Sequence, residues 1–201
     1  MKRAIEVVCA VMVCGSVVLA AASSVQAAPI EWAAGSGGNG HYYEIVLDDW
    51  ITWDDALVGA AGRSHAGVDG HLATLTTSAE QDFLVGVYGG GPMDLLWLGG
   101  YQDKQAGDYS EPNGGWRWIT GEGWNTTSGK PYFSFNNNYW GQSEEYLITW
   151  WGTGGINDLL ANPTDPRGPS RGYLVEYPAP EPTTLGLLAL GGLAVLRRRR
   201  K

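Results

Sequence analysis

Few residues of this chain have the types and spacing that catalysis or metal binding requires. The three histidines, His41, His65 and His71, show no metal-binding pattern such as H-E-x-x-H, and we expect them to have packing or surface roles. Residues 48–49 and 54–55 are paired aspartates, a residue type that glycoside hydrolysis uses. That reaction needs two carboxylates that face each other across a cleft, which adjacency in sequence does not provide. Helix capping and solvation explain these pairs better.

Two further stretches contain part of a catalytic or phosphate-binding pattern. Residues 62-GRSHA-66 lack the second glycine of a nucleophile elbow, and no predicted strand leads into them. Residues 89-GGG-91 lack the lysine and the serine or threonine of a phosphate-binding P-loop. We therefore predict that the protein is not an enzyme.

The first 27 residues have the three parts of a secretory signal peptide. A basic start precedes an apolar run over residues 7–22, and 25-VQA-27 is a small-residue cleavage motif. A membrane anchor is the alternative, but a spanning helix needs about 20 apolar residues and this run is shorter. We predict export and cleavage after Ala27. Both cysteines, Cys9 and Cys14, lie in this segment, so the mature chain has no thiol for disulfides, zinc or catalysis.

The region between the two ends of the chain is strongly acidic. Six basic and 19 acidic residues fall in 28–178, which gives this region a net charge near −13. Such a field repels phosphates, so we expect no nucleic-acid partner. It is compatible with cations, calcium among them, and with neutral sugars. Solubility alone accounts for most of these carboxylates.

The elements predicted between residues 41 and 177 are two helices followed by short strands. Thr52 is a good N-cap for a helix through residue 61, and Thr77 with Glu80 forms a capping box for a helix to about residue 88. Gly-, Asn- and Pro-rich turns separate the strands, so we predict an α+β domain with an antiparallel sheet and with Trp97, Trp116 and Trp118 in its core. We expect residues 28–40 to be a flexible lead-in and 62–70 a loop. The predicted strands are 41–49, 71–75, 95–101, 115–120, 145–151 and 172–177.

The order of these pieces resembles the C-type lectin-like domain. The resemblance covers residues 41–177 and implies two helices, short antiparallel sheets and a long loop region. The disulfides of animal members are absent here. The matching landmarks are 41-HYYE-44, 52-TWDDA-56, 70-GHLATLTTSAEQDFL-84, 97-WLGG-100, 115-GWRWITGE-122, 144-EEYL-147, 155-GINDL-159 and 172-GYLVEY-177.

In that family a Glu-Pro-Asn tripeptide in the long loop helps to bind calcium, which in turn holds sugar hydroxyls. Here residues 111-EPN-113 come before the W-x-W strand and not after it, so we predict that they form a turn. The matching position is 136-NNN-138, where Asn136 replaces a carboxylate and the middle Asn replaces a proline.

The resemblance therefore implies a single degenerate calcium site in the long loop. Its five predicted metal and ligand-binding residues are Asn136, Asn138, Glu144, Asn157 and Asp158. Calcium takes six to eight oxygen ligands, and these side chains with a backbone carbonyl could supply them. Each residue also has a simpler interpretation as turn or strand-edge chemistry.

The last segment, 178–201, combines a Pro-rich linker, an apolar run and five basic residues. The apolar run of 12 residues would span about 18 Å as a helix, which is short for a hydrocarbon core about 30 Å thick. The order Pro180-Glu181-Pro182, apolar run and arginine cluster resembles the PEP-CTERM sorting signal. That resemblance implies transient association with the inner membrane and processing by an exosortase-type enzyme. A short permanent anchor is the alternative.

The sequence thus predicts an exported, surface-sorted bacterial protein with a C-type lectin-like domain that binds extracellular carbohydrate or exopolysaccharide. The alternative is an adhesive or structural matrix protein that uses the same fold to bind protein without calcium.

Overall fold

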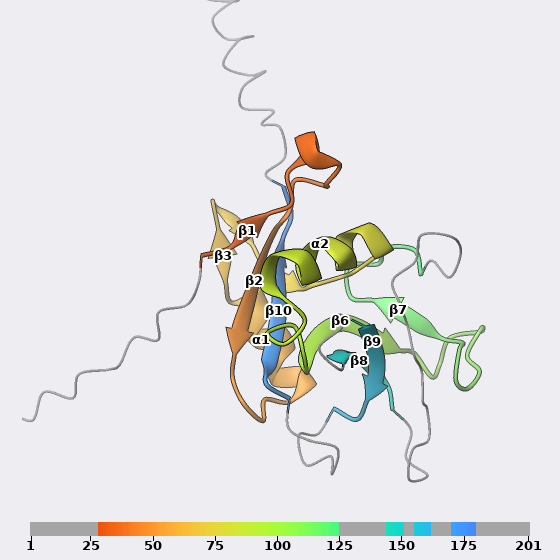
Figure 1. Ribbon diagram of the computed structural model, residues 1–201. Coiled ribbons are helices and arrows are strands. Elements are labelled where there is room, and N and C mark those ends of the chain that lie inside the picture. Colours follow the sequence, from red (N-terminus) through yellow and green to blue (C-terminus); the bar gives the residue numbers. More distant parts are fainter. Residues whose placement is uncertain (1–27, 125–143, 151–154, 162–169, 180–201) are drawn as a thin grey trace, which may run out of the picture.

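The computed structural model describes residues 28–124, 144–150, 155–161 and 170–179 (Figure 1). They form two α-helices and a mainly antiparallel sheet, so the predicted α+β fold is confirmed. None of the helices in these ranges is long and apolar enough to cross a membrane.

The helices are η1 (Ala34–Ser36), α1 (Trp53–Ala61) and α2 (Ser78–Tyr88). The strands are β1 (Ile30–Glu31), β2 (Tyr42–Leu47), β3 (Ser64–His65), β4 (Val68–Asp69), β5 (His71–Leu72), β6 (Leu96–Gln102), β7 (Trp116–Trp118), β8 (Tyr146–Trp150), β9 (Gly155–Leu159) and β10 (Gly172–Tyr177).

The first and last long strands of the domain lie side by side at the centre of the sheet. The strand order is β1-β2-β10-β6-β8-β9, with β5 paired to β10 and β7 paired to β6. β10 runs antiparallel to β2 along its whole length, from Gly172 opposite Leu47 to Tyr177 opposite Tyr42. In Figure 1 the blue β10 accordingly lies beside the orange β2. The pairing closes the domain because it joins its two ends.

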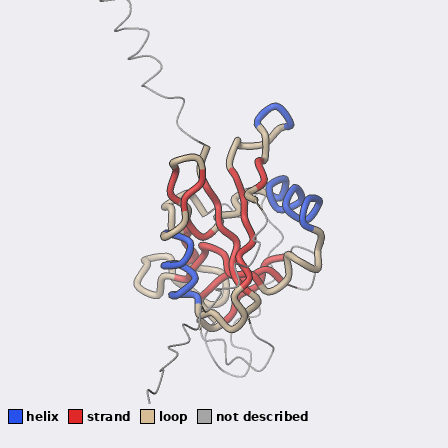
Figure 2. The backbone as a smooth tube through the Cα atoms, turned by 90° about the vertical axis from the view of Figure 1, so that its left-hand side faces the viewer, coloured by secondary structure: helices blue, strands red, loops and turns tan. Residues whose placement is uncertain are grey.

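Both faces of the β2–β10 pair are covered. Alternate side chains of a strand point to opposite faces, and Figure 2 shows the two helices on opposite sides of the strands. On one face, Leu84 of α2 shares a core cluster with Tyr43 and Leu174. On the other face, Ala56 of α1 shares a second cluster with Val175. A strand that is buried on both faces shows no polar alternation, which is why β2 and β10 are nearly all apolar or aromatic.

The two helices begin where the sequence predicts. Thr52 Oγ1 accepts a hydrogen bond from the backbone N–H of Asp55 at 3.0 Å, and Thr77 Oγ1 accepts one from Glu80 at 3.2 Å. Both predicted N-caps are confirmed. The capping box differs in one respect: the Glu80 carboxylate accepts from the backbone N–H of Thr76 at 2.9 Å, one residue before the cap. The same carboxylate also binds a side chain of the sheet, which holds it in this position.

The predicted aromatic core is confirmed. The exposed fractions of Trp97, Trp116 and Trp118 are 0%, 1% and 3%. Two of these indole N–H groups have backbone acceptors: Trp97 donates to the carbonyl of Ile51 at 2.9 Å, and Trp116 donates to that of Pro112 at 3.0 Å. These bonds satisfy the polar edge of large rings that otherwise bury apolar surface.

The structure adds three features to those predicted. Residues 28–40, expected as a flexible lead-in, contain β1 and η1, and Trp32 stacks on Phe83 of α2 at a ring distance of 5.6 Å. Residues 62–70, expected as a loop, contain the β3–β4 hairpin. β9 lies in a segment that was matched as a landmark but not predicted as a strand. Strands of two residues are too short to show an alternation of apolar and polar residues. In β9 this alternation is absent because the polar residues Asn157 and Asp158 are buried.

A glycine at the start of β10 is required by close packing against β2. A Cβ at Gly172 would lie 1.9 Å from the carbonyl oxygen of Val46, and its φ of 146° is one that other residues rarely adopt. We expect Gly172→Ala to lower the free energy of unfolding by about 1–3 kcal/mol or more, because backbone must move to admit the methyl group. Urea unfolding measures this change.

The matched control is Gly86→Ala, on an open surface of α2 with nothing within 4 Å of the added methyl group. It is expected to stabilise the domain by up to about 1 kcal/mol through helix propensity. Equal effects of the two substitutions would contradict the packing account.

Candidate functional site

Three of the five predicted calcium ligands lie in the described part of the structure, at the β8–β9 hairpin. Asn157 and Asp158 are neighbours in β9, and Glu144 lies just before β8, the strand paired with β9. The three side chains are buried, with exposed fractions of 0% for Glu144 and Asp158 and 5% for Asn157. The Asn157 amide nitrogen donates to the backbone carbonyl of Asp158 at 2.9 Å. The amide oxygen is thus the atom of Asn157 that a cation would use.

The other two predicted ligands, Asn136 and Asn138, lie outside the described residues. Within the described ranges, no three His, Asp or Glu side chains gather in a way that could hold a metal ion. A calcium site here would therefore depend on amide and backbone oxygens in addition to Glu144 and Asp158. Those donor types fit calcium, which is a hard cation that prefers oxygen.

The early Glu-Pro-Asn tripeptide forms a turn between β6 and β7, as predicted. The Glu111 carboxylate accepts hydrogen bonds from Gln102 Nε2 at 3.2 Å and from the Tyr109 hydroxyl at 2.5 Å. Pro112 supplies the carbonyl that Trp116 binds. The side chain of Glu111 thus helps to hold its own loop together.

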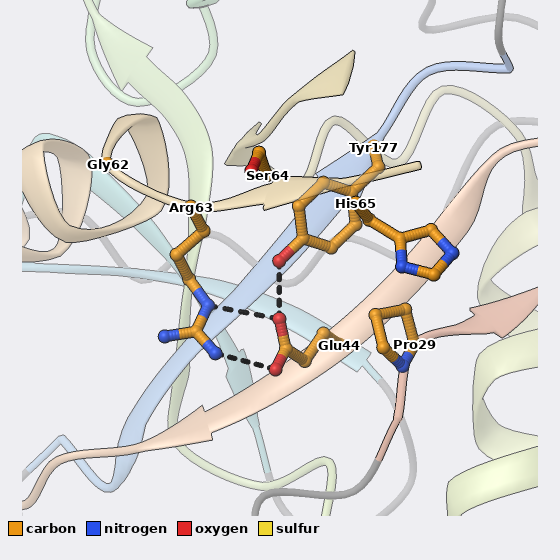
Figure 3. A pocket seen from close by; sticks show the side chains of 7 residues that line it. All are labelled: Pro29, Glu44, Gly62, Arg63, Ser64, His65 and Tyr177. Atoms are coloured by element: carbon orange, nitrogen blue, oxygen red, sulfur yellow. Dashed lines mark hydrogen bonds and ion pairs between the residues drawn. The ribbon is translucent and has the colours of Figure 1, made fainter. Parts of the chain in front are cut away.

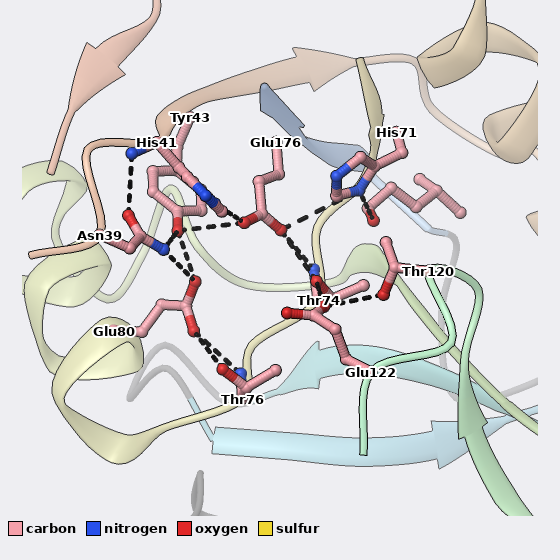
Figure 4. A network of polar contacts seen from close by, with 11 residues as sticks. Asn39, His41, Tyr43, His71, Thr74, Thr76, Glu80, Thr120, Glu122 and Glu176 are labelled. Atoms are coloured by element: carbon pink, nitrogen blue, oxygen red, sulfur yellow. Dashed lines mark hydrogen bonds and ion pairs between the residues drawn. The ribbon is translucent and has the colours of Figure 1, made fainter. Parts of the chain in front are cut away.

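A buried polar network, which the sequence did not predict, lies on the α2 side of the sheet (Figure 4). At its centre is Glu176 of β10, whose exposed fraction is 2%. One carboxylate oxygen accepts a hydrogen bond from the backbone N–H of Thr74 at 2.8 Å, and the other lies 2.5 Å from His41 Nδ1. The network joins the start of β2, the end of β10 and the segment before α2.

A second carboxylate completes this network from the helix. Glu80 of α2 is also 2% exposed, and it accepts a short hydrogen bond from the Tyr43 hydroxyl. The same hydroxyl lies 3.4 Å from Glu176 and accepts a hydrogen bond from Asn39 Nδ2 at 3.0 Å. Tyr43 thus stands between two buried carboxylates that repel each other when both are charged.

This arrangement shifts the protonation of its members. Burial, and then the charge of Glu176, raises the pKa of Glu80 to about 7. The hydrogen bond to Glu176 raises the pKa of His41, against a smaller opposing effect of burial. Burial raises the pKa of Tyr43 well above its usual range, so this hydroxyl remains a donor. The network therefore changes its charge near neutral pH.

The sequence contains a signal for the central carboxylate of this network, although a weak one. Glu176 is the only charged residue of its strand, 172-GYLVEY-177, as is Glu44 of 42-YYEIVL-47, whose side chain points to the opposite face. A lone acid in a strand buried on both faces must find partners inside the domain. The identity of those partners comes from the fold, because they are distant in sequence.

The end of β10 leads directly into the tail. Residues 178–201 match the family model described as the PEP-CTERM protein-sorting motif. The tail is a PEP-CTERM signal. It marks the chain as an exported protein that is sorted to the cell surface.

The chain also has a curated relative of a very different size. Halomucin from Haloquadratum walsbyi is 30% identical over 172 residues, an alignment that covers 78% of this chain. The chain spans only 2% of the length of halomucin. The similarity therefore concerns one segment of a much larger protein.

The solved structures that the chain resembles include C-type lectins. The lectin CEL-I from Cucumaria echinata is 20% identical, with a TM-score of 0.49, and the alignment covers 71% of this chain and 93% of CEL-I. The murine dendritic cell inhibitory receptor 2, solved as its lectin domain in complex with N-glycan, is also 20% identical. Its TM-score is 0.47, over 69% of this chain and 91% of the receptor domain.

The stability of the domain is expected to depend on pH through Glu80. Its pKa is about 7 in the folded chain and near the ordinary value of a carboxyl group when unfolded. The folded state then binds more protons, and its stability falls as pH rises from about 4.5 through 7, by up to about 3 kcal/mol. His41 changes stability in the same direction. Glu80→Gln removes the larger part of this loss, which thermal unfolding at about pH 5 and pH 8 measures.

Asp82→Asn is the control, because Asp82 lies on the exposed side of the same helix. It should keep the wild-type pH dependence. An unchanged dependence in Glu80→Gln would show that Glu80 does not carry the effect.

Proposed function

We propose that this protein is a surface-sorted lectin-like protein that binds extracellular carbohydrate or exopolysaccharide, with calcium held at the β8–β9 hairpin. The observation that carries the proposal is the position of Glu144, Asn157 and Asp158. Asn157 and Asp158 lie in β9, Glu144 lies two residues before its partner strand β8, and together they combine two carboxylates with an amide. Asn136 and Asn138 would complete the ligand set.

The chemistry of these donors agrees with calcium and not with a softer metal. Carboxylate and amide oxygens are hard ligands, and the mature chain has no cysteine. Bound calcium would supply open coordination positions for two neighbouring sugar hydroxyls. The net charge near −13 over residues 28–178 favours a cation and disfavours an anionic ligand.

The PEP-CTERM tail supports a location at the cell surface, where extracellular polysaccharide occurs. We propose that the tail associates transiently with the inner membrane and that an exosortase-type enzyme processes it. The lectin-like domain would then meet polysaccharide at the cell surface.

Calcium is expected to stabilise the mature chain. At a hundredfold excess over the dissociation constant, a site present only in the folded state adds about 2.7 kcal/mol. That corresponds to about 5–10 °C in melting temperature for a domain of this size. The isosteric variants Glu144→Gln and Asp158→Asn should lose the shift, while Glu111→Gln, in the β6–β7 turn, should keep it. Thermal unfolding with calcium and with chelator measures each case.

The ligand is tested separately on a glycan array with calcium and with chelator. Binding that needs calcium and is lost in Asp158→Asn supports the proposal. The absence of a calcium shift in the wild-type chain contradicts the metal site. If glycan binding is also absent, the adhesive role, with calcium-independent binding of protein, becomes the better account.

A further inference from the structure

A pocket lies on the α1 side of the sheet, on the face opposite the Glu176 network (Figure 3). Its volume is about 270 Å³, and it is open to solvent. It contains none of the residues proposed to bind calcium. The lining residues are Pro29, Glu44, Gly62, Arg63, Ser64, His65 and Tyr177.

The β3–β4 hairpin builds one side of this pocket. Ala66 and Gly67 form its tight turn, with φ values of 51° and 81°, as two-residue hairpin turns require. Arg63 and His65 are two residues apart, and both contact the β2–β10 pair. Arg63 reaches Glu44, and the His65 ring lies 5.6 Å from that of Tyr177. The hairpin thus turns a cation and an aromatic ring towards the sheet.

An ion pair forms the base of the pocket. Arg63 Nη2 and Nε donate to the two oxygens of Glu44 at 2.6 and 3.0 Å, and the Tyr177 hydroxyl donates to the same carboxylate. The Glu44 side chain is 6% exposed and that of Arg63 is 31% exposed. A ligand in the pocket would therefore meet the guanidinium first, and the charge of that group is already balanced.

Aromatic rings form the wall beside this pair. The half-buried His65 ring lies 4.6 Å from the Tyr42 ring, tilted by 48° to it, and 5.6 Å from the ring of Tyr177, which is 2% exposed. Pro29 adds an apolar surface, and Ser64 contributes a hydroxyl. The pocket thus combines the His65 ring with groups that donate and accept hydrogen bonds.

These lining groups favour some classes of ligand over others. The domain is strongly acidic and the charge of Arg63 is already balanced by Glu44, so a free anion is disfavoured. A purely apolar molecule is also disfavoured, because the floor of the pocket consists of charged side chains. A neutral sugar has an apolar ring face for the aromatic wall and hydroxyls that both donate and accept. The volume is below the roughly 300–1,000 Å³ of pockets for drug-sized ligands, which suits a single sugar residue.

We propose that this pocket is a second, calcium-independent site that binds one neutral sugar residue against the half-buried His65 ring, beside the Arg63–Glu44 pair. It goes beyond the function proposed above and does not rest on it. An exported chain with two such sites would contact a polysaccharide at two points, which raises its avidity even when each contact is weak.

The test is saturation-transfer NMR on the full chain with EDTA present. The probes are the methyl glycosides of glucose, galactose, mannose and N-acetylglucosamine, with glucuronate as the anionic comparison. We expect transfer from at least one neutral glycoside. Gly62→Phe adds a ring at the pocket rim, where φ is −79° and an added Cβ would meet its nearest atoms at 3.5 and 3.6 Å. It should weaken binding about tenfold or more.

His65→Ala, which removes one ring of the wall, should weaken binding in the same direction. Gly86→Phe, on an open surface of α2, should leave it unchanged. Circular dichroism confirms that each variant folds. The proposal is overturned if none of the neutral glycosides binds, if binding requires calcium, if glucuronate binds in preference, or if folded Gly62→Phe binds as the wild type does. Loss of calcium binding in Asp158→Asn, with EDTA-resistant binding retained, would separate the two sites.

Discussion

The rest of the structure depends on the pairing of β2 with β10. These strands lie near the two ends of the domain, and their six-residue register brings those ends together. Because a helix covers each face of the pair, the strands are buried on both sides and each face belongs to its own hydrophobic cluster. Residues 28–201 contain no cysteine, so packing and backbone hydrogen bonds close the domain without a disulfide.

Burial on both faces makes the polar residues of these strands costly unless they are paired. Each strand carries one glutamate, and the two point to opposite faces. Glu44 is neutralised by Arg63, just before the β3–β4 hairpin, and Glu176 is held by Thr74 and His41. The two polar clusters differ in kind: the first is a balanced ion pair beside solvent, whereas the second holds two buried acids and changes its charge near neutral pH.

The pairing of β2 with β10 also determines where the sorting tail joins the domain. β10 ends at Tyr177, and the PEP-CTERM motif begins at the next residue, so the sorting signal follows directly from the central strand. The tail is thus joined to one of the best-buried elements of the domain. The pocket beside Tyr177 lies at this end of β10. The predicted calcium residues lie at β8 and β9, which are separated from β10 in the sheet by β6.

The sequence by itself determined the C-terminal sorting signal, the two capped helices, most of the long strands and the aromatic core. These follow from local patterns: caps at Thr52 and Thr77, apolar runs, and turn residues between them. It also identified residues 111–113 as a turn, because their place before the W-x-W strand did not suit a ligand. The five predicted calcium residues stay a prediction, since Asn136 and Asn138 lie outside the described residues.

Only the tertiary structure decided which distant residues meet. The contacts of Glu80 with Tyr43, and of Glu44 with Arg63, join segments that are 37 and 19 residues apart. No local pattern encodes such pairs, because the sheet register and the helix docking set them. The β3–β4 hairpin was missed for a related reason, as strands of two residues have too few positions to show a period. The pocket forms because the hairpin packs against β2 and β10. This packing depends on the whole folded domain and cannot be predicted from the hairpin sequence alone.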